Sequence, residues 1–364
     1  RDRSVSRGLG DVYKRQTATL LTMALAGNVQ AAEIRSVGPD GEAAVDASTI
    51  ELTDDQIAQI KEGGYTAAIC LHYGGNDWST SQQKGLEDTF GELGIEIVAV
   101  TDANFSAETQ VSNIETVMAK KPDILVSIPT DATATADAYK QAAAAGIKIV
   151  FMDQRADGLE AGKDYVSVVS ADNYGNGYAS GTVLGDALGG KGKVAMVYYD
   201  ANFAPTNQRD EGFRDAMKNY PDIEIVTEQG FTDESGCAEQ GDAILTQFPN
   251  IDGIYASWDV PMEGVLSAVR AAGMEGKVTL ACNDLGNNVA REIASGNIAG
   301  GGAQMPYDQG VAEAKLAALA LLGEETPSYV AVPAETVTHE NVLEAYTDVY
   351  HVETPDWLKE AYVE

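Results

Sequence analysis

The sequence predicts an α/β protein with two open, mostly parallel sheets. Short apolar runs alternate with stretches of helical periodicity along most of the chain. Most of these runs are apolar throughout, as expected for strands that helices cover on both faces. Near mid-chain, residues 165–181 combine a strand, a polar loop and a glycine-rich helix start, where a passage between two lobes would fall. A single barrel of βα units is the alternative, but it accounts for this passage less well.

The expected strands are short runs rich in β-branched and aromatic residues. They cover residues 65–71, 95–100, 124–128, 147–152, 165–169, 194–199, 223–226, 251–256 and 278–282. A capped helix is expected over residues 52–61, where Thr53 precedes two acidic residues. Longer helices are expected at residues 108–120 and 307–322. Because helices connect successive strands, the sheets should be parallel with right-handed crossovers.

Composition and charge exclude several classes of partner. Hydrophobic residues make up 44% of the chain and charged residues 22%, which is typical of a soluble globular protein with a full core. The formal net charge of −32 disfavours binding to nucleic acid and favours a soluble monomer. Cys70, Cys237 and Cys282 have spacings that fit no metal site, and whether Cys237 and Cys282 pair is open. We therefore expect neither a metal nor a cofactor.

The first 32 residues are expected to be absent from the mature protein. Residues 17–27 form an apolar run that follows Lys14 and Arg15 and is too short to span a bilayer. Small residues come next, where a signal peptidase would cut. We expect a secretory signal peptide cleaved near Ala31 or Ala32, with residues 1–16 as a cloning or assembly scar. A buried N-terminal helix is the alternative.

Common catalytic motifs are absent from the sequence. There is no H-E-x-x-H, G-x-S-x-G or paired C-x-x-C motif. Residues 185–191 match G-x-x-x-x-G-K, but they lie between a helix and a strand, the reverse of a phosphate-binding loop. An enzyme with a zinc ion or a nucleophile is therefore not expected. A carboxylate-dependent sugar enzyme that pairs Asp153 with Asp284 is an alternative.

Polar and aromatic side chains follow the ends of the expected strands, where open α/β sheets bind ligands. These segments are residues 72–78, 153–155, 207–213, 230–231, 257–259, 283–284 and 304–307. Carboxylates and amides can bond to hydroxyl groups, and Arg donates in a fork. An aromatic ring can cover the apolar C–H face of a sugar. Each residue alone could serve as a helix cap or a core ring, but together they predict a sugar site.

The region from Tyr65 to about Pro333 resembles the ribose-type periplasmic sugar-binding proteins. The resemblance rests on ordered segments, namely PDILVSIPTDATAT, GIKIVFMDQ, VSADNYGNG, NQRDEGF, CNDL and GAQMPYDQG. It implies that Asp153, Arg209, Asp284 and Gln304 contact a sugar and that Phe231 stacks on it. The sequence departs from the family pattern at residues 76–79, 154–155 and 258. A pentose, a hexose and a sugar alcohol are therefore all open as ligands.

The resemblance implies a type I periplasmic binding fold, with two Rossmann-like lobes joined by a three-strand hinge near residues 171–173, 304 and 333. We expect an N-terminal extension (33–64), an N-terminal lobe (65–172 and 305–333) and a C-terminal lobe with a tail (173–304 and 334–364). The implied function is the soluble, periplasmic binding component of a sugar ABC importer. It would close on a monosaccharide, dock on a membrane permease and catalyse no reaction. An amino-acid binder with the same fold is an alternative.

The strand-end segments and the resemblance together predict thirteen ligand-binding residues. They are Asn76, Asp77, Trp78, Asp153, Gln154, Arg155, Asn207, Arg209, Phe231, Trp258, Asp259, Asp284 and Gln304.

Overall fold

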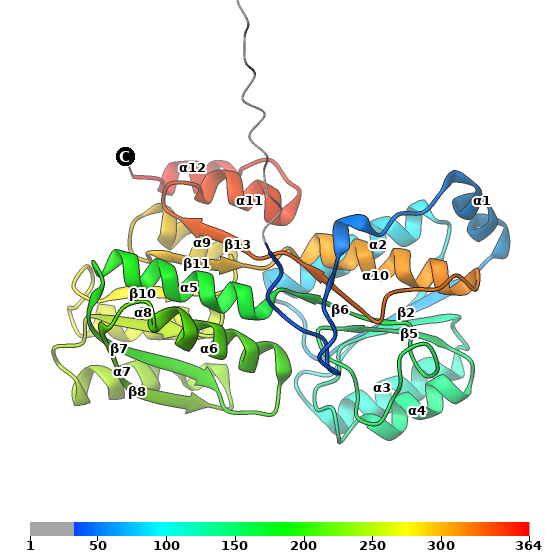
Figure 1. The fold of residues 1–364 in the computed structure, drawn as a ribbon, viewed down its shortest axis with the longest axis horizontal. Helices are drawn as coiled ribbons and strands as arrows, with labels where there is room; N and C mark the ends of the chain where they lie inside the picture. Colours follow the sequence, from blue (N-terminus) through cyan, green and yellow to red (C-terminus); the bar gives the residue numbers. More distant parts are fainter. Residues whose placement is uncertain (1–32, 364) are drawn as a thin grey trace, which may run out of the picture. The chain divides into compact units, whose positions relative to one another are not determined.

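The computed structural model describes residues 33–363, which form two α/β lobes (Figure 1). The expected signal peptide and the residues before it lie outside this range. No helix within residues 33–363 is long and apolar enough to cross a membrane.

The N-terminal lobe is built on a seven-stranded sheet with the order β1-β12-β6-β5-β4-β2-β3. Its strands are β1 (Val45–Asp46), β2 (Thr66–Leu71), β3 (Glu96–Asp102), β4 (Ile124–Ser127), β5 (Lys148–Met152), β6 (Ser167–Ala171) and β12 (Tyr329–Val332). All neighbouring strands are parallel. Its helices are α1 (Asp54–Gly63), α2 (Asp77–Glu92), α3 (Ala107–Ala119), α4 (Ala136–Ala144) and α10 (Pro306–Leu321), with a short 3-10 helix η1 (Ala47–Thr49).

Side chains on these strands alternate between two cores, as the pleat of a strand requires. Ala67 and Ile69 of β2 pack with α2 and α10, whereas Ala68 and Cys70 pack with α3 and α4. Figure 1 shows the same layers, with α2 and α10 on one face of the sheet and α3 and α4 on the other. The continuous apolar runs in the sequence follow from this double cover.

The C-terminal lobe contains a six-stranded sheet with the order β13-β11-β10-β9-β7-β8. Its strands are β7 (Lys191–Tyr199), β8 (Asp222–Phe231), β9 (Gly253–Ala256), β10 (Thr279–Cys282), β11 (Gly300–Ala303) and β13 (Glu335–Thr338). Only β13, next to β11, runs antiparallel to its neighbour among the described strands. Its helices are α5 (Asn173–Ala187), α6 (Ala204–Met217), α7 (Cys237–Gln247), α8 (Asp259–Ala271), α9 (Asn287–Ala294), α11 (Val342–Tyr350) and α12 (Asp356–Ala361), with a 3-10 helix η2 (Glu234–Gly236).

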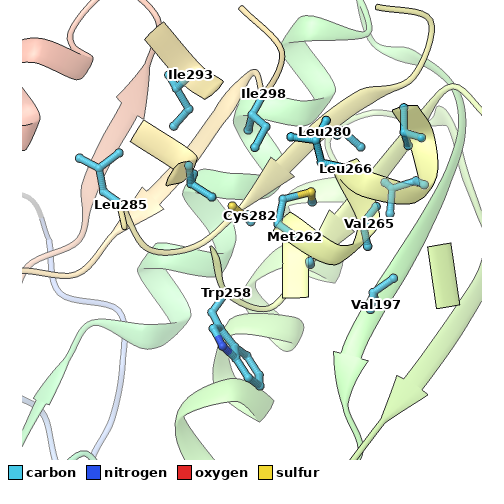
Figure 2. Close-up of a cluster of buried hydrophobic side chains, with 14 of the residues drawn as sticks. Val197, Trp258, Met262, Val265, Leu266, Leu280, Cys282, Leu285, Ile293 and Ile298 are labelled. Carbon is cyan, nitrogen blue, oxygen red and sulfur yellow. The ribbon is translucent and has the colours of Figure 1, made fainter. Parts of the chain in front are cut away.

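This sheet also separates two cores. Met196 and Tyr255 pack beneath α5 and α6, and Val197 and Ile254 pack with α7, α8 and α9. Figure 2 shows the second core, with Trp258 at its border below Met262. The three cysteines are buried free thiols, so Cys237 and Cys282 do not pair.

The chain passes between the two sheets at three places. It leaves β6 for α5 at residues 171–173, leaves β11 for α10 at 303–306, and leaves β12 for β13 at 332–335. Asp172, in the first passage, caps α5 by accepting from Gly175 N at 2.9 Å. The same carboxylate accepts from the backbone N–H groups of Arg35 at 3.0 Å and Ser36 at 2.8 Å. The segment before β1 is therefore tied to the passage between the lobes.

All nine expected strands are confirmed, and so are the three helices, which begin within two residues of the expected positions. Thr53 and Gln56 form a capping box at the start of α1. The sequence did not predict β1, β11, β12 or β13. Strand β11 reads GGGA, a composition poor in strand formers. Its glycines are needed because a Cβ on Gly301 would lie 1.7 Å from the carbonyl oxygen of Cys282.

Residues 33–64, expected as an extension, contribute β1 to the edge of the N-terminal sheet beside β12. The tail contributes β13 to the C-terminal sheet. Tail residues Val342, Tyr346 and Leu358 also join the core of that lobe.

Candidate functional site

A pocket lies between the two lobes, at the carboxyl ends of their parallel strands. It is lined by His72, Tyr73, Asn76, Trp78, Phe105, Ile128, Asp153, Tyr199, Phe203, Pro205, Thr206, Arg209, Trp258, Asp284 and Gln304. The space free of protein atoms is about 450 Å³, with open solvent at its mouth included. The pocket thus draws aromatic and polar side chains from both lobes.

Arg209 on α6 is the cation of the pocket, and its side chain is only 6% exposed. Its Nε donates to Asn173 Oδ1 at 2.8 Å, and its Nη1 donates to Asp284 Oδ2 at 3.1 Å. Burial alone would lower the pKa of Arg209, but the charges of Asp284 and Asp153 raise it. No hydrogen bond within residues 33–363 uses its Nη2. The guanidinium is thus fixed in place with one free pair of N–H donors.

Asp153 follows β5 and presents a free acceptor. Its Oδ1 accepts from Ser170 Oγ at 3.0 Å, Ala171 N at 3.3 Å and Gln309 Nε2 at 3.3 Å. Burial raises the pKa of Asp153, while the charge of Arg209 and these hydrogen bonds oppose that rise. Its Oδ2 accepts no hydrogen bond from the described residues. One carboxylate oxygen is therefore used for positioning, and the other is left for a ligand.

Asp284 and Gln304 also contribute polar groups to the pocket. Asp284 Oδ1 accepts from Gln304 Nε2 at 2.7 Å, so both oxygens of this carboxylate are occupied. Gln304 Oε1 is a buried acceptor that no donor of the described residues reaches. Asp153 and Asp284 have φ values of +54° and +70°, and Phe105 has +58°. Left-handed backbone is uncommon for residues other than Gly and is enriched at functional sites, although Asp adopts it more readily than Phe does.

Aromatic rings from both lobes form the walls. Tyr73 stacks on Phe105 with ring centroids 4.2 Å apart, both from the N-terminal lobe. Tyr199 meets Trp258 edge to face at 5.6 Å in the C-terminal lobe. The indole N–H of Trp78 is buried and has no partner among the described residues, while that of Trp258 is directed at Glu234. The pocket thus combines flat apolar faces with a few unpaired polar groups.

Comparison with known proteins identifies the family. A sequence model described as "Periplasmic binding protein domain" matches residues 64–325. The chain belongs to this family. The D-ribose/D-allose-binding protein of Pseudomonas aeruginosa is 29% identical, over 72% of this chain and 83% of that protein. The ribose import binding protein of Bacillus subtilis is 27% identical, over 58% of this chain and 67% of that protein.

Solved structures agree with this assignment. An ABC transporter solute-binding protein from Actinobacillus succinogenes with bound D-allose has a TM-score of 0.71 and 29% identity, covering 76% of this chain and 99% of its own. One from Agrobacterium vitis with bound α-D-tagatopyranose has a TM-score of 0.73 and 26% identity, covering 80% of this chain and all of its own. The predicted fold class, the type I periplasmic binding fold, is therefore confirmed.

Seven of the thirteen predicted residues line the pocket of this periplasmic binding protein. They are Asn76, Trp78, Asp153, Arg209, Trp258, Asp284 and Gln304. Asn76 also has a structural role, because its Oδ1 caps α2 by accepting from Ser79 N at 2.8 Å. Its Nδ2 donates to Tyr73 Oη at 2.5 Å.

Three predicted residues of the C-terminal lobe lie outside the pocket lining. Asn207 is exposed on α6. Phe231 is buried behind Trp258, with ring centroids 5.1 Å apart. Asp259 is buried and accepts from the backbone N–H of Gly286 at 3.0 Å. Burial, and next the charge of Asp284, raise the pKa of Asp259.

Three predicted residues of the N-terminal lobe are also outside the lining, and each has another partner. Arg155 pairs with Asp40 at 2.6 Å. Gln154 accepts from Ala204 N at 3.0 Å, which links the two lobes. Asp77 accepts from Asn287 N at 2.7 Å, across the lobes at the start of α9.

The pocket also contains residues that were not predicted. They are His72, Tyr73, Phe105, Ile128, Tyr199, Phe203, Pro205 and Thr206. Most follow the end of a strand, as the predicted residues do, but they are aromatic or apolar. Aromatic residues just after β2, β3 and β7 were the signal that could have found them.

The protonation of His72 tests how completely the aromatic side chains of the pocket bury this residue. It packs against Tyr73, Trp78, Phe105 and Phe203, and burial lowers its pKa from 6.5 to about 3. Below pH 6.5 the unfolded chain therefore binds a proton that the native protein does not, so stability is lost as pH falls. Between pH 7 and pH 5 we expect His72→Phe to gain about 2 kcal/mol relative to the parent protein.

Urea unfolding at pH 7, 6 and 5 checks this prediction. The difference at pH 7 serves as the internal reference, because it contains only the change in packing. Parallel stability profiles for the two proteins between pH 7 and pH 5 would contradict a buried, neutral His72.

Proposed function

We propose that this protein is the soluble substrate-binding component of an ABC importer and that its pocket binds a monosaccharide. The observation that carries the proposal is the set of unpaired polar groups in a pocket that two indole rings also line. Asp153 Oδ2 and Gln304 Oε1 can accept, and Arg209 Nη2 can donate. Each sugar hydroxyl donates and accepts, so it satisfies such groups where water is excluded. The relatives named for ribose and allose support the same ligand class.

The arrangement of carboxylates disfavours a sugar enzyme. A glycosidase of the usual kind needs two carboxyl groups that are free to react. Asp284 has both oxygens occupied by Arg209 and Gln304, which leaves Asp153 with one free oxygen. An amino-acid ligand is also disfavoured, because the one cation among the described residues that line the pocket already pairs with Asp284. A sugar or a sugar alcohol fits this set of groups better.

We expect the two lobes to close on a ligand, because residues from both lobes line the pocket. Trp78 and Asp153 belong to the N-terminal lobe, and Arg209 and Trp258 belong to the C-terminal lobe. A ligand that touches both lobes binds the closed arrangement more tightly and so shifts the population toward it. The closed protein would then dock on a membrane permease in the periplasm. The transport step belongs to that partner.

A thermal-shift screen tests the proposed function. The probes are D-ribose, D-allose, D-tagatose, D-xylose, allitol and myo-inositol, with L-amino acids as the contrasting class. A ligand at 100 times its Kd stabilises the native state by about 2.7 kcal/mol, so a melting temperature several degrees higher is expected for a sugar. Recovery of that sugar unchanged completes the test. A rise with an amino acid alone, or a cleaved product from a glycoside, would overturn the proposal.

Asp77 is expected to control affinity without touching the sugar. Its carboxylate accepts from Asn287 N at 2.7 Å and Asn287 Nδ2 at 2.8 Å, so one lobe caps helix α9 of the other. Because these bonds join the two lobes, we expect opening of the lobes to break them, so Asp77→Ala should weaken binding about fivefold, the equivalent of ~1 kcal/mol. Calorimetry gives the affinity, and stopped-flow measurements should show that the loss is in the dissociation rate.

The matched control is Asp356→Ala. Asp356 is also the first residue of a helix, but its side chain is 92% exposed and pairs only with Lys359 of its own helix. This variant should bind as the parent protein does. Equal affinities for the Asp77 and Asp356 variants would show that the contact with α9 does not stabilise closure.

A further inference from the structure

Glu313 on α10 is a carboxyl group buried beside the pocket with no cation to balance it. It is completely buried. Its Oε1 accepts from Gln82 Nε2 of α2 at 2.6 Å, and its Oε2 has no partner among the described residues. None of the ion pairs within residues 33–363 includes Glu313. An ionised carboxylate in such a place is strongly disfavoured.

Gln309, one helical turn before Glu313, has a buried oxygen that lacks a hydrogen-bond donor. Its Nε2 donates to Val169 O at 3.0 Å and to Asp153 Oδ1 at 3.3 Å. A carbonyl and a carboxylate can only accept, so the amide of Gln309 cannot be turned around. Its Oε1 therefore points elsewhere, buried and without a donor among the described residues. Residues four apart on a helix are neighbours, which places this oxygen beside Glu313.

We propose that Glu313 is a neutral carboxylic acid in the native protein and that its Oε2–H donates to Gln309 Oε1. One proton then satisfies Glu313 Oε2 and Gln309 Oε1, while Gln82 Oε1 remains a third buried acceptor without a donor among the described residues. With Oε1 bonded to Glu313, Gln309 keeps its Nε2 on Asp153 Oδ1 and leaves Asp153 Oδ2 facing the pocket. Glu313 is thus a positioning residue for Asp153, and this part of the inference rests on the proposed function. The protonation state of Glu313 does not rest on it.

The charges around Glu313 favour the neutral form. Burial raises the pKa of Glu313 well above its usual value, and the negative charge of Asp153 raises it further, while the hydrogen bond from Gln82 opposes the rise. Among the charged groups on α10 and on the elements that pack against it, Lys315 of α10 and Lys148 of β5 form no ion pair within residues 33–363, whereas four other residues form two pairs. These pairs are Lys84 with Asp88 at 2.6 Å and Asp308 with His351 at 3.0 Å.

Infrared spectroscopy of the ligand-free protein tests the protonation directly. We expect the difference between the parent protein and Glu313→Gln at pH 7 to contain the carbonyl band of a protonated carboxyl group, shifted by ¹³C labelling of glutamate. Glu335 is the matched control. It is also a partly buried glutamate. A band that is present in the Glu313→Gln difference spectrum and absent from the Glu335→Gln difference spectrum at the same pH belongs to Glu313. A carboxylate band in place of the protonated band at Glu313 would overturn the proposal.

Stability as a function of pH is a second test that needs no ligand. A raised pKa means that above pH 4.5 the native protein holds a proton that the unfolded chain has lost. Stability from this group is therefore full below pH 4.5 and is lost as pH rises. Relative to Glu313→Gln, the unfolding constant of the parent protein should increase up to about tenfold per pH unit between pH 5 and pH 8. Identical pH profiles would contradict the proposal.

Binding separates the positioning role from a purely structural one. Gln at position 313 keeps a donor for Gln309, whereas Met has a similar volume and no donor. With D-allose as the probe, Glu313→Gln should bind within about twofold of the parent protein and Glu313→Met about tenfold more weakly. Equal Kd values for the two variants would exclude the positioning role. If D-allose does not bind the parent protein, the functional proposal fails for that sugar, and the infrared and pH tests still decide the state of Glu313.

Discussion

Replacing the buried ion pair with Arg209→Met and Asp284→Asn together is expected to abolish sugar binding while the protein stays folded. Arg209→Ala alone should cost about 3–5 kcal/mol of stability, because it leaves a buried carboxylate unpaired. The double replacement removes both charges and should recover most of that loss. Binding should not recover, since the free Nη2 donors are gone. Removing one buried charged group from an interface costs about 2–5 kcal/mol, so affinity should fall about 30-fold or more.

Calorimetry and urea unfolding on the same preparations separate the two effects. The control is the neutral pair Arg214→Met with Glu228→Gln. Arg214 is on the same helix, five residues further on, and it pairs with Glu228 at 2.6 Å, with both side chains more than a third exposed. This control should bind sugar normally. If the Arg209–Asp284 double variant also binds normally, Arg209 is a structural residue and not a ligand residue.

Gly177→Ala is expected to destabilise the protein by about 2–3 kcal/mol, although Ala is the better helix former. A Cβ at Gly177 would lie 1.8 Å from the carbonyl oxygen of Arg209 and 2.5 Å from its carbonyl carbon. These are backbone atoms of α6, which cannot rotate away, so α5 and α6 must move apart. Because α6 carries Arg209 into the pocket, sugar affinity should fall as well.

Gly91→Ala is the matched control for this prediction. Gly91 lies in α2, and nothing is within 4 Å of a Cβ placed there. The replacement should therefore stabilise the protein by about 0.5–1 kcal/mol through helix propensity alone. Urea unfolding compares the two variants. Similar stabilities would show that α5 and α6 can accommodate a methyl group between them.

The sequence predicts most of the fold because apolar periodicity is a local property. Nine strands and the capped helix α1 could be read from runs of a few residues. Strand β11 could not, because its GGGA sequence reflects the close approach of a helix and a neighbouring strand. A Cβ on Gly302 would lie 2.3 Å from the carbonyl oxygen of Asn176 in α5. Such a requirement exists only in the folded protein.

The sequence could predict which segments form the site, because these segments follow strand ends that converge. It could not predict which side chains of those segments point into the pocket. Trp258 lines the pocket, but Asp259, the next residue, turns toward the backbone of Gly286. Arg155 was predicted beside Asp153, yet it pairs with Asp40, 115 residues away in the chain. Both outcomes depend on contacts between distant segments. Of the aromatic walls, Trp78 and Trp258 were predicted, whereas Tyr73, Phe105 and Tyr199 were not.

Strand β1 has a consequence for how fragments of this protein should be cut. The family match begins at residue 64, so a fragment that starts there lacks Val45 and Asp46, which pair with Val330 and Ala331 of β12. The all-buried strand β12 would then become an open, apolar sheet edge. Such an edge invites pairing between molecules and aggregation. A fragment intended for crystallisation or biosensor use should therefore keep the residues from 33 onward.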